Sequence, residues 1–474
     1  MNAAVSIGIF AFFMLATVAL GLASLWGRGR TSLEDWSVGG RNLGSVFIWV
    51  LMAGEVYTSF SYLGAAGWGY LYGVPIYYEF AYLACGYGLG YFFGPMLWAY
   101  ARKHHLVSLS DIAGHRFQSP WLGGAIAVLA TIFLLPYIQL EITGMGVVVS
   151  TISYGVISLG WGYVIAFVVT EAFVVLSGLR GSAWVSVLKD TLVIATLLVL
   201  AIYIPLHYFG GYAQLFQRLI ATHPGWLTLP GHDSPGLGEG WFATTGIVNS
   251  IGFVVFPTSI ASYLGARSGT VLRRNAIFLP FYQLLLFVPM LLGMAALFVV
   301  PHLTNSNLAL FAMVTQALPA WLVGIVGVAG ALSSIVPMAV FMLVIGTMWG
   351  RSVLGTSRRT AAYQKPLSQG IAFVAGVVAL VLTFVAPSTL VRLSVISYEG
   401  IAQFAPIVLV GLLYRRMTTA GALSGLAVGV VVVCLLVFSG HDPLDGVNAG
   451  LIGLVLNAAV NFAVSSLRQS DVPL

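Results

Sequence analysis

Glutamates inside long apolar stretches are the residues of this chain best suited to chemistry. Glu55 lies in the segment 53–59 (AGEVYTS). A carboxylate at the middle of a membrane costs about 2.5–3.5 kcal/mol, so a function is expected for it. Glu55 could balance a bound cation, hydrogen-bond a solute or carry a proton. Of the other glutamates in such stretches, Glu141 is the stronger candidate, and a bond to a neighbouring helix would also explain Glu79 and Glu171.

A pair of serines offers a second kind of chemistry. Ser333 and Ser334 follow Gly330 by three and four residues, so on a helix the three residues share one face. Hydroxyls, together with the bare carbonyls of an interrupted helix, are ligands that suit a sodium ion. The spacing leaves an alternative open, because serines in membrane helices also bond back to a preceding carbonyl.

The composition shows what must position these residues. The chain has 474 residues, of which 59% are hydrophobic and 7% charged. A soluble domain of this length would carry roughly 118 charged residues, whereas this chain carries 20 basic and 14 acidic ones. A soluble enzyme and a nucleic-acid binder are therefore excluded, and the expected surroundings are a lipid bilayer. Cys85 and Cys434 are expected to be small buried apolar residues rather than a disulfide or metal site.

Thirteen apolar stretches are long enough to cross a membrane as helices, at about 20 residues each. An all-α membrane protein with about 13 spans is predicted. The first stretch has no positively charged start and is not expected to be a cleaved signal peptide. The predicted spans are 4–26, 44–66, 77–100, 122–152, 157–178, 184–208, 243–265, 275–301, 319–349, 368–386, 394–414, 419–438 and 446–466.

The basic residues orient these spans. With the N-terminus outside and the C-terminus in the cytoplasm, 18 of the 20 basic residues, Lys189 among them, fall in inside segments. Only Arg218 and Arg392 fall outside. The positive-inside rule predicts such a division. The longest outside loop, 209–242, is expected to pack over the spans.

Four segments together resemble the sodium:solute symporter family, nearly from end to end. They are 35–44 (DWSVGGRNLG), 53–59 (AGEVYTS), 330–334 (GALSS) and 400–406 (GIAQFAP), the last followed by Gly411, Arg415 and Gly421. The resemblance implies a LeuT-like core of two inverted five-helix repeats. The expected layout is one polytopic domain over 1–474. It comprises the first span and a cytoplasmic loop (1–43), the first repeat (44–208), the second repeat (243–414) and two C-terminal spans (415–474).

Interruptions in the second and seventh spans support this architecture independently. Ala53-Gly54-Glu55 interrupts one span, and Gly252 with Phe256-Pro257-Thr258 interrupts the other. Discontinuous helices at corresponding positions of two halves indicate a transporter's binding site.

The resemblance also implies a sodium site. Its ligands would be the carbonyls of Ala53, Val56 and Gly330 and the hydroxyls of Ser333 and Ser334. Glu55 departs from the aspartate or asparagine of many relatives and is assigned to coupling of ion and substrate. A proton-coupled symporter, with Glu55 or Glu141 as the carrier, remains the alternative.

The substrate is expected at the midplane, and the stretch that runs from Gly54 to Tyr70 resembles relatives that handle monocarboxylates. No basic residue is expected at mid-membrane to pair with a carboxylate. Amino acids, pantothenate-type acids and sugars remain open. The candidate binding residues are Tyr57, Thr58, Tyr137, Gln139, Thr258 and Gln403.

The sequence therefore predicts sodium-coupled uptake of a small organic acid by alternating access across the plasma (inner) membrane. The partners are the solute and Na⁺, with no other cofactor or metal and no nucleic acid, and an oligomer is not required. An enzyme is not expected, because a polytopic membrane enzyme would need acids and histidines clustered at one interface, and here they are scattered. A sensory receptor on a transporter core is a further, weaker alternative.

Overall fold

The computed structural model describes residues 2–23, 32–355 and 361–467, and within them every regular element is a helix. The first half forms α1 (Asn2–Ala23), α2 (Leu33–Val38), α3 (Ser45–Val56), α4 (Ala65–Leu71), α5 (Tyr78–Lys103), α6 (Leu109–Arg116), α7 (Pro120–Ile152), α8 (Leu159–Phe209) and α9 (Tyr212–Thr222). The second half forms α10 (Glu239–Val255), α11 (Pro257–Gly265), α12 (Gly269–Tyr282), α13 (Phe287–Val299), α14 (Ala309–Ala317), α15 (Ala320–Met348), α16 (Ala361–Val385), α17 (Leu390–Ile401), α18 (Gly411–Leu413), α19 (Thr419–Phe438) and α20 (Ala449–Leu467).

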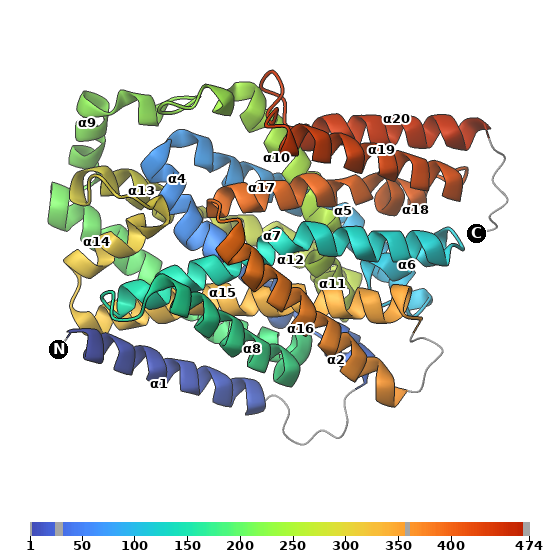
Figure 1. Ribbon diagram of the computed structural model, residues 1–474, viewed down its shortest axis with the longest axis horizontal. Coiled ribbons are helices and arrows are strands. Elements are labelled where there is room, and N and C mark those ends of the chain that lie inside the picture. The colour runs from blue at the N-terminus through green and yellow to red at the C-terminus, as the bar shows by residue number, and fades with distance from the viewer. Residues whose placement is uncertain (1, 24–31, 356–360, 468–474) are drawn as a thin grey trace.

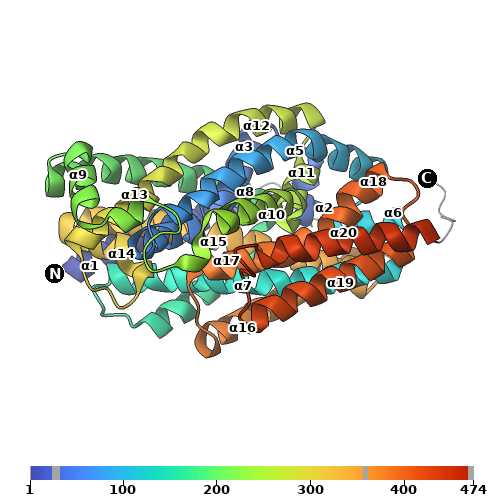
Figure 2. The same cartoon turned by 90° about the horizontal axis from the view of Figure 1, so that it is seen from above.

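These helices form one elongated bundle (Figure 1). The most apolar part of α15 is entirely buried, whereas in the most apolar parts of α1, α16, α19 and α20 a third of the residues or fewer are buried. Figure 2 shows α16, α19 and α20 along one margin of the bundle, away from α12 and α3. The centre is therefore built by helices that other helices surround, as a site shielded from lipid requires.

Nine helices of the described residues are long and apolar enough to cross a membrane, or eleven if two bent pairs are each counted as one span. The segment Leu159–Val174 is apolar but shorter, and α5 has 26 residues but is more polar. Every predicted span overlaps one of these segments. The expected membrane protein is confirmed, and the count of thirteen stays a prediction.

The predicted loop between the fifth and sixth spans is a kink inside α8. Gly178 there has φ 58° and ψ −170°, which an L side chain rarely adopts. A Cβ at this position would lie 2.7 Å from Cδ1 of Trp36. Both the backbone and the packing of Trp36 thus require glycine, and two spans are joined without a loop.

Two spans are broken close to the interruptions that the sequence predicts. The first break begins at Tyr57, just after the predicted Ala53-Gly54-Glu55, which are helical in α3, and the second lies at Phe256, as predicted. The first span consists of α3, a break at residues 57–59 of which Tyr57 and Thr58 are unwound, a π-helical turn Phe60–Gly64 and α4, and it bends by 51°. The second consists of α10 and α11, bent by 43° at Phe256. Phe256 is extended, with φ −58° and ψ 132°, because the residue before a proline is disfavoured in the helical region.

A short backbone bridge joins these broken spans at one end. Leu43 N bonds to Gly265 O and Arg267 N bonds to Leu43 O, each at 3.0 Å. The start of the first broken span is thereby tied to the end of the second.

The segment 209–242 covers the end of the first broken span, as expected. The indole of Trp226 donates to Tyr70 O (2.9 Å), and His232 N bonds to Tyr72 O (3.2 Å). The first helix of the segment, α9, buries only Leu215 and Leu219 on one face.

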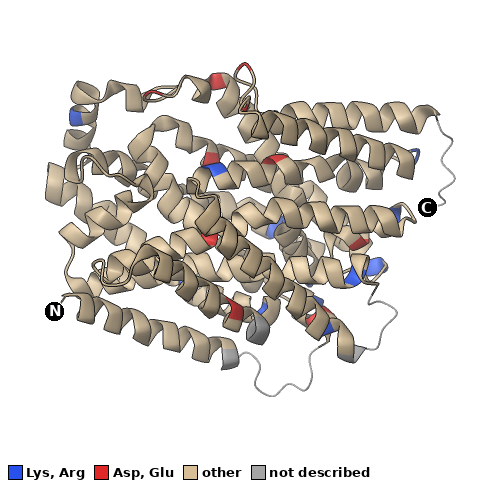
Figure 3. Ribbon diagram, in the orientation of Figure 1, with Lys and Arg blue, Asp and Glu red and all other residues tan. Residues whose placement is uncertain are grey.

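Most lysines and arginines lie in the half of the molecule toward which α20 ends, and α1 begins at the opposite end (Figure 3).

Single-cysteine variants test the predicted orientation. With Cys85 and Cys434 replaced by alanine, Gln217→Cys on α9 should react with an impermeant maleimide in intact cells. Lys103→Cys, at the end of α5, should react only after the membrane is permeabilised, because the two exposed sites are predicted on opposite sides. The cysteine-free parent is the control. Labelling of both variants in intact cells would show that the span count between them is wrong.

Candidate functional site

The first break frees carbonyl groups that a continuous helix would use. α3 closes with a hydrogen bond from Tyr57 N to Ala53 O (3.1 Å). The next amide, Thr58 N, bonds to Val56 O (2.8 Å) instead of reaching Gly54 O four residues earlier. A buried carbonyl needs a donor, so Gly54 O must find its partner outside its own helix.

A buried lysine supplies that partner. The ammonium of Lys189, on α8, donates hydrogen bonds to Gly54 O (2.6 Å) and Tyr57 O (3.0 Å). Its third neighbour is Asp190, whose Oδ1 lies 3.3 Å from Nζ. The side chain of Lys189 is 0% exposed and that of Asp190 is 3% exposed. The first break therefore binds a cation that belongs to the protein itself.

This placement corrects two expectations. Lys189 does not lie in an inside segment, and a basic residue does reach the centre of the bundle. Sequence reasoning missed it because one lysine and one aspartate do not stop an 18-residue window within Gly178–Phe209 from reaching a mean hydropathy of 2.2. The signal was present, since the Lys189–Asp190 pair falls within the predicted span 184–208 rather than beyond its end.

Two more helices contact the break at Ser59. Glu141, on α7, accepts a hydrogen bond from Ser59 N (3.1 Å to Oε2). The hydroxyl of Ser59 lies 2.6 Å from that of Ser334 on α15. All three residues are buried. Glu141 and one of the two predicted serines are thus brought to the break.

Glu55 joins the two broken spans. Its carboxylate accepts a hydrogen bond from the hydroxyl of Ser262 on α11 (2.5 Å). Thr258, in the first turn of α11, interacts with the same carboxylate. Because α3 and α11 belong to different broken spans, Glu55 makes the position of one depend on the other.

The two carbonyls of α3 predicted to bind sodium already accept hydrogen bonds. Ala53 O accepts from Tyr57 N, and Val56 O accepts from Thr58 N and from the hydroxyl of Ser61 (2.5 Å). The pair that contacts a cation is Gly54 and Tyr57, one residue further along the chain. Gly54 and Tyr57 are three residues apart, as Ala53 and Val56 are.

Both predicted hydroxyl ligands on α15 bond back to a preceding carbonyl, which is the alternative that their spacing left open. Ser333 donates to Ala329 O (2.8 Å) and Ser334 donates to Gly330 O (3.2 Å). Ser334 also contacts Ser59 across the break. Of the two hydroxyls, that of Ser334 is in contact with the first broken span.

Four of the six substrate candidates lie at or beside the breaks. Tyr57 donates its hydroxyl to Tyr282 O (3.1 Å), and the hydroxyl of Thr58 accepts from a backbone amide of the π turn. The ring centroids of Tyr137 and Phe256 are 5.6 Å apart at the second break, where Thr258 also lies. These residues remain candidates for substrate contact.

The two glutamines hold other helices together. The amide of Gln139 donates to Ala386 O (2.7 Å), just beyond α16. The amide of Gln403 donates to Gly450 O (3.0 Å) on α20. Both side chains are buried in these contacts, so the structure does not bring them to the breaks.

The other two glutamates differ in position. Glu79 on α5 accepts a hydrogen bond from Ser61, whose hydroxyl also contacts Val56 O, so Glu79 lies beside the first break. The carboxylate of Glu171 on α8 lies close to Gly376 of α16. Its contacts are with a peripheral helix.

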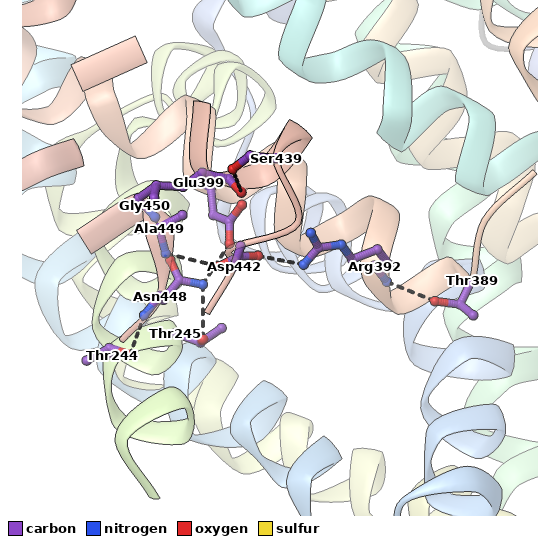
Figure 4. Close-up of polar contacts among 11 residues, drawn as sticks. Thr244, Thr245, Thr389, Arg392, Glu399, Ser439, Asp442, Asn448, Ala449 and Gly450 are labelled. Carbon is purple, nitrogen blue, oxygen red and sulfur yellow. Dashed lines mark hydrogen bonds and ion pairs between the residues drawn. The ribbon is translucent and has the colours of Figure 1, made fainter. Parts of the chain in front are cut away.

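A pocket of about 310 Å³ lies beneath the segment 209–242, lined by Trp68, Tyr72, Asp233, Trp241 and Arg392 among others. Figure 4 shows Arg392 directed at Asp442, with a contact of 2.5 Å. Asp442 is buried and also accepts from Ala449 N (3.1 Å). The Arg392 side chain is 34% exposed, so its guanidinium is held by Asp442 and still accessible from the pocket.

The sodium:solute symporter family model matches residues 36–429, most of the chain. The chain belongs to this family. A 35% identical relative, an uncharacterized symporter of Bacillus subtilis, matches over 99% of this chain and 98% of its own length. A monocarboxylate transport permease protein of Rhizobium johnstonii is 27% identical over 99% of this chain and 98% of its own. Family membership and these symporter relatives point to a membrane transporter rather than an enzyme.

The fold agrees with this family assignment. The solved structure of a Na⁺-coupled sialic acid symporter superposes with a TM-score of 0.79 at 14% identity, over 99% of both chains. The symporter family's LeuT-like fold, expected from the sequence, is thus shown, and the two broken spans are its central elements.

Alanine variants separate the roles of the paired serines. We expect Ser334→Ala to reduce solute transport at least about tenfold, because it removes the hydroxyl that contacts the break. Ser333→Ala, which removes only a bond within α15, should retain most of the transport. Initial uptake rates in proteoliposomes, corrected for the amount of protein, compare the neighbouring variants. Equal losses would instead support the sodium site predicted from sequence, which needs both hydroxyls.

Proposed function

We propose that this chain is a secondary active symporter that takes up a small monocarboxylate together with a cation bound at the first break. The observation that carries the proposal is the concentration of charge around this break. Glu55, Glu141 and Asp190 all interact with Lys189, and Glu79 lies next to Val56.

Three carboxyl groups thus interact with one ammonium, and a fourth, that of Glu79, lies beyond Ser61 at the same break. Glu79, Glu141, Lys189 and Asp190 are buried. If every carboxyl group were ionised, the negative charges would outnumber the positive one in a region largely shielded from water. Buried charges need partners, so protons or a metal cation must accompany these acids. A cation taken from one side of the membrane and released on the other would couple transport to its gradient.

Two cations are candidates. Family membership favours Na⁺, for which the sequence supplies Ala53, Val56, Gly330, Ser333 and Ser334 as proposed ligands. The contact of Lys189 with Gly54 O and Tyr57 O favours a proton instead, because a titratable group of the protein occupies the carbonyl pair.

The proposed substrate class rests on two supports. A relative that matches nearly the whole chain is named a monocarboxylate transporter. The pocket under the segment 209–242 presents Arg392, whose guanidinium can bind a carboxylate in two-pronged fashion, beside the indoles of Trp68 and Trp241. We propose this pocket as the first contact for an organic anion on its way to Tyr57, Thr58, Tyr137 and Thr258.

We further propose the plasma (inner) membrane as the location, with the N-terminus outside and the C-terminus in the cytoplasm. The solute, the coupling cation and the lipid bilayer are the partners that this function needs. A single chain contains both broken spans, so an oligomer is not required. Two inverted repeats, 44–208 and 243–414, remain the proposed division of the domain.

Uptake of labelled pyruvate into proteoliposomes tests the function. Pyruvate is a suitable probe because its carboxylate stays ionised at neutral pH. Purified protein should accumulate it against a concentration gradient when a sodium or a proton gradient is imposed. Excess lactate should compete, whereas glucose and proline should not. A tenfold cation gradient is worth about 1.4 kcal/mol, so one cation per anion gives about tenfold accumulation. Accumulation of proline but not of pyruvate would assign another substrate class.

An arginine variant tests the outer pocket. Arg392→Gln should raise the pyruvate concentration for half-maximal uptake by about tenfold, because the pocket loses its charged donor. Arg392→Lys should recover part of that loss, since it keeps the charge that pairs with Asp442. Arg218→Gln on α9 is the matched control and should behave as the parent. An unchanged half-saturation in Arg392→Gln, with normal folding, would remove Arg392 from the path of the substrate.

A further inference from the structure

We propose that the coupling ion is a proton carried by Lys189, whose ammonium occupies the carbonyl pair at the first break in place of sodium. This inference rests on the proposed function and specifies its ion. It differs from the proton-coupled alternative that the sequence suggests, because the carrier is a lysine rather than Glu55 or Glu141.

The geometry matches an ammonium. A charged lysine has three N–H donors and no acceptor. Nζ donates hydrogen bonds to Gly54 O (2.6 Å) and Tyr57 O (3.0 Å), and Asp190 Oδ1 lies 3.3 Å away as its ion-pair partner. A neutral amine could still donate to both carbonyls, but it would lose the charge that pairs with Asp190. The surroundings therefore bind the protonated form better, and loss of the proton weakens the link between α8 and the break.

The charged groups around Lys189 come from several helices. Asp190 is its neighbour on α8, Glu55 approaches from α3 and Glu141 from α7. Glu79 of α5 lies beyond Ser61. Of the other helices that pack against α8, α1, α13 and α15 contain no charged residue or histidine, whereas α2 carries Glu34 and Asp35, α9 carries Arg218 and α16 carries Lys365. The charged groups that act on Lys189 itself, Asp190, Glu141 and Glu55, are all acids, and each favours its positive charge.

A sodium ion cannot share this carbonyl pair with the ammonium. Two cations bound to Gly54 O and Tyr57 O would lie within a few ångströms of each other in a region of low dielectric, where like charges repel strongly. Sodium binding there would require Lys189 to leave. The protein's own cation thus makes the external ion unnecessary for holding the break.

The proposed cycle moves one proton for each solute. Lys189 is protonated from outside, and its ammonium fixes Gly54 and Tyr57 while the solute binds beside Tyr57 and Thr58. On the inner side the proton passes from Nζ to water, the neutral amine releases the break, and the solute leaves. The lysine is then protonated again from outside.

Melting temperatures in detergent test the occupied carbonyl pair without any solute. The parent should melt at the same temperature in sodium chloride and in choline chloride, because Lys189 excludes sodium. Lys189→Ala vacates the pair and leaves the acids without their cation, so it should gain a sodium-dependent rise of roughly 3 °C or more. Lys103→Ala, at the exposed end of α5, is the matched control and should show no such rise.

Pyruvate transport tests the carrier. With sodium absent, an inward proton gradient should drive accumulation by the parent. Lys189→Arg keeps the positive charge but does not release its proton, so it should lose gradient-driven accumulation at least about tenfold more than it loses counterflow exchange. Counterflow needs no ion gradient and reports the proposed function by itself.

The outcomes are distinguishable. Absence of pyruvate counterflow in the parent contradicts the proposed function, and the melting temperatures still decide the role of Lys189. A sodium-dependent rise in the parent as large as that in Lys189→Ala would overturn the inference. Accumulation by the parent that requires sodium at constant pH would overturn it as well.

Discussion

An unwound helix inside a membrane must have its exposed carbonyls satisfied by protein, because lipid offers no donor. This requirement organises the centre of the molecule. The break at residues 57–59 is held by Lys189 of α8, Glu141 of α7 and Ser334 of α15, while Glu55 extends from it to Ser262 of α11. Helices far apart in sequence converge on one segment of six residues, 54–59. The buried charges of this region, unfavourable elsewhere in a membrane protein, are present because the break needs them.

The two breaks differ in what encodes them. The second is local, since Pro257 alone disfavours a helical conformation at Phe256. The first contains no proline and is maintained by contacts from other helices. A break set by a proline is encoded in the chain itself, whereas a break held by contacts depends on those contacts. The first break is therefore the better place for an ion to control, and the second acts as a fixed counterpart joined to it through Glu55.

The sequence predicted the architecture well, for physical reasons that differ from those governing the site. Hydropathy and loop charge depend on averages over some 20 residues, so the spans, both interruptions and the family fold were recoverable. Which carbonyls the break frees depends on a single backbone turn at Thr58, so the contact of Lys189 with Gly54 O and Tyr57 O could not be predicted, and Ala53 and Val56 remain the proposed sodium ligands. Lys189 was not predicted at the centre of the bundle, because a single charge changes the mean hydropathy of a span only slightly. Gln139 and Gln403 were chosen as polar residues within spans, and the bonds that their amide groups donate to carbonyls beside α16 and on α20 could not be predicted from that pattern.

The backbone bridge between Leu43 and residues 265–267 has a kinetic meaning. It joins the start of one broken span to the end of the other through two hydrogen bonds, each worth about 1 kcal/mol net. Such a bridge is weak enough to open at thermal energies, and a displacement of Leu43 would break both bonds, since its N–H forms one and its C=O accepts the other. The exchange of the amide hydrogens of Leu43 and Arg267 with heavy water would therefore report the opening of this end of the transporter, without a substrate or an attached probe.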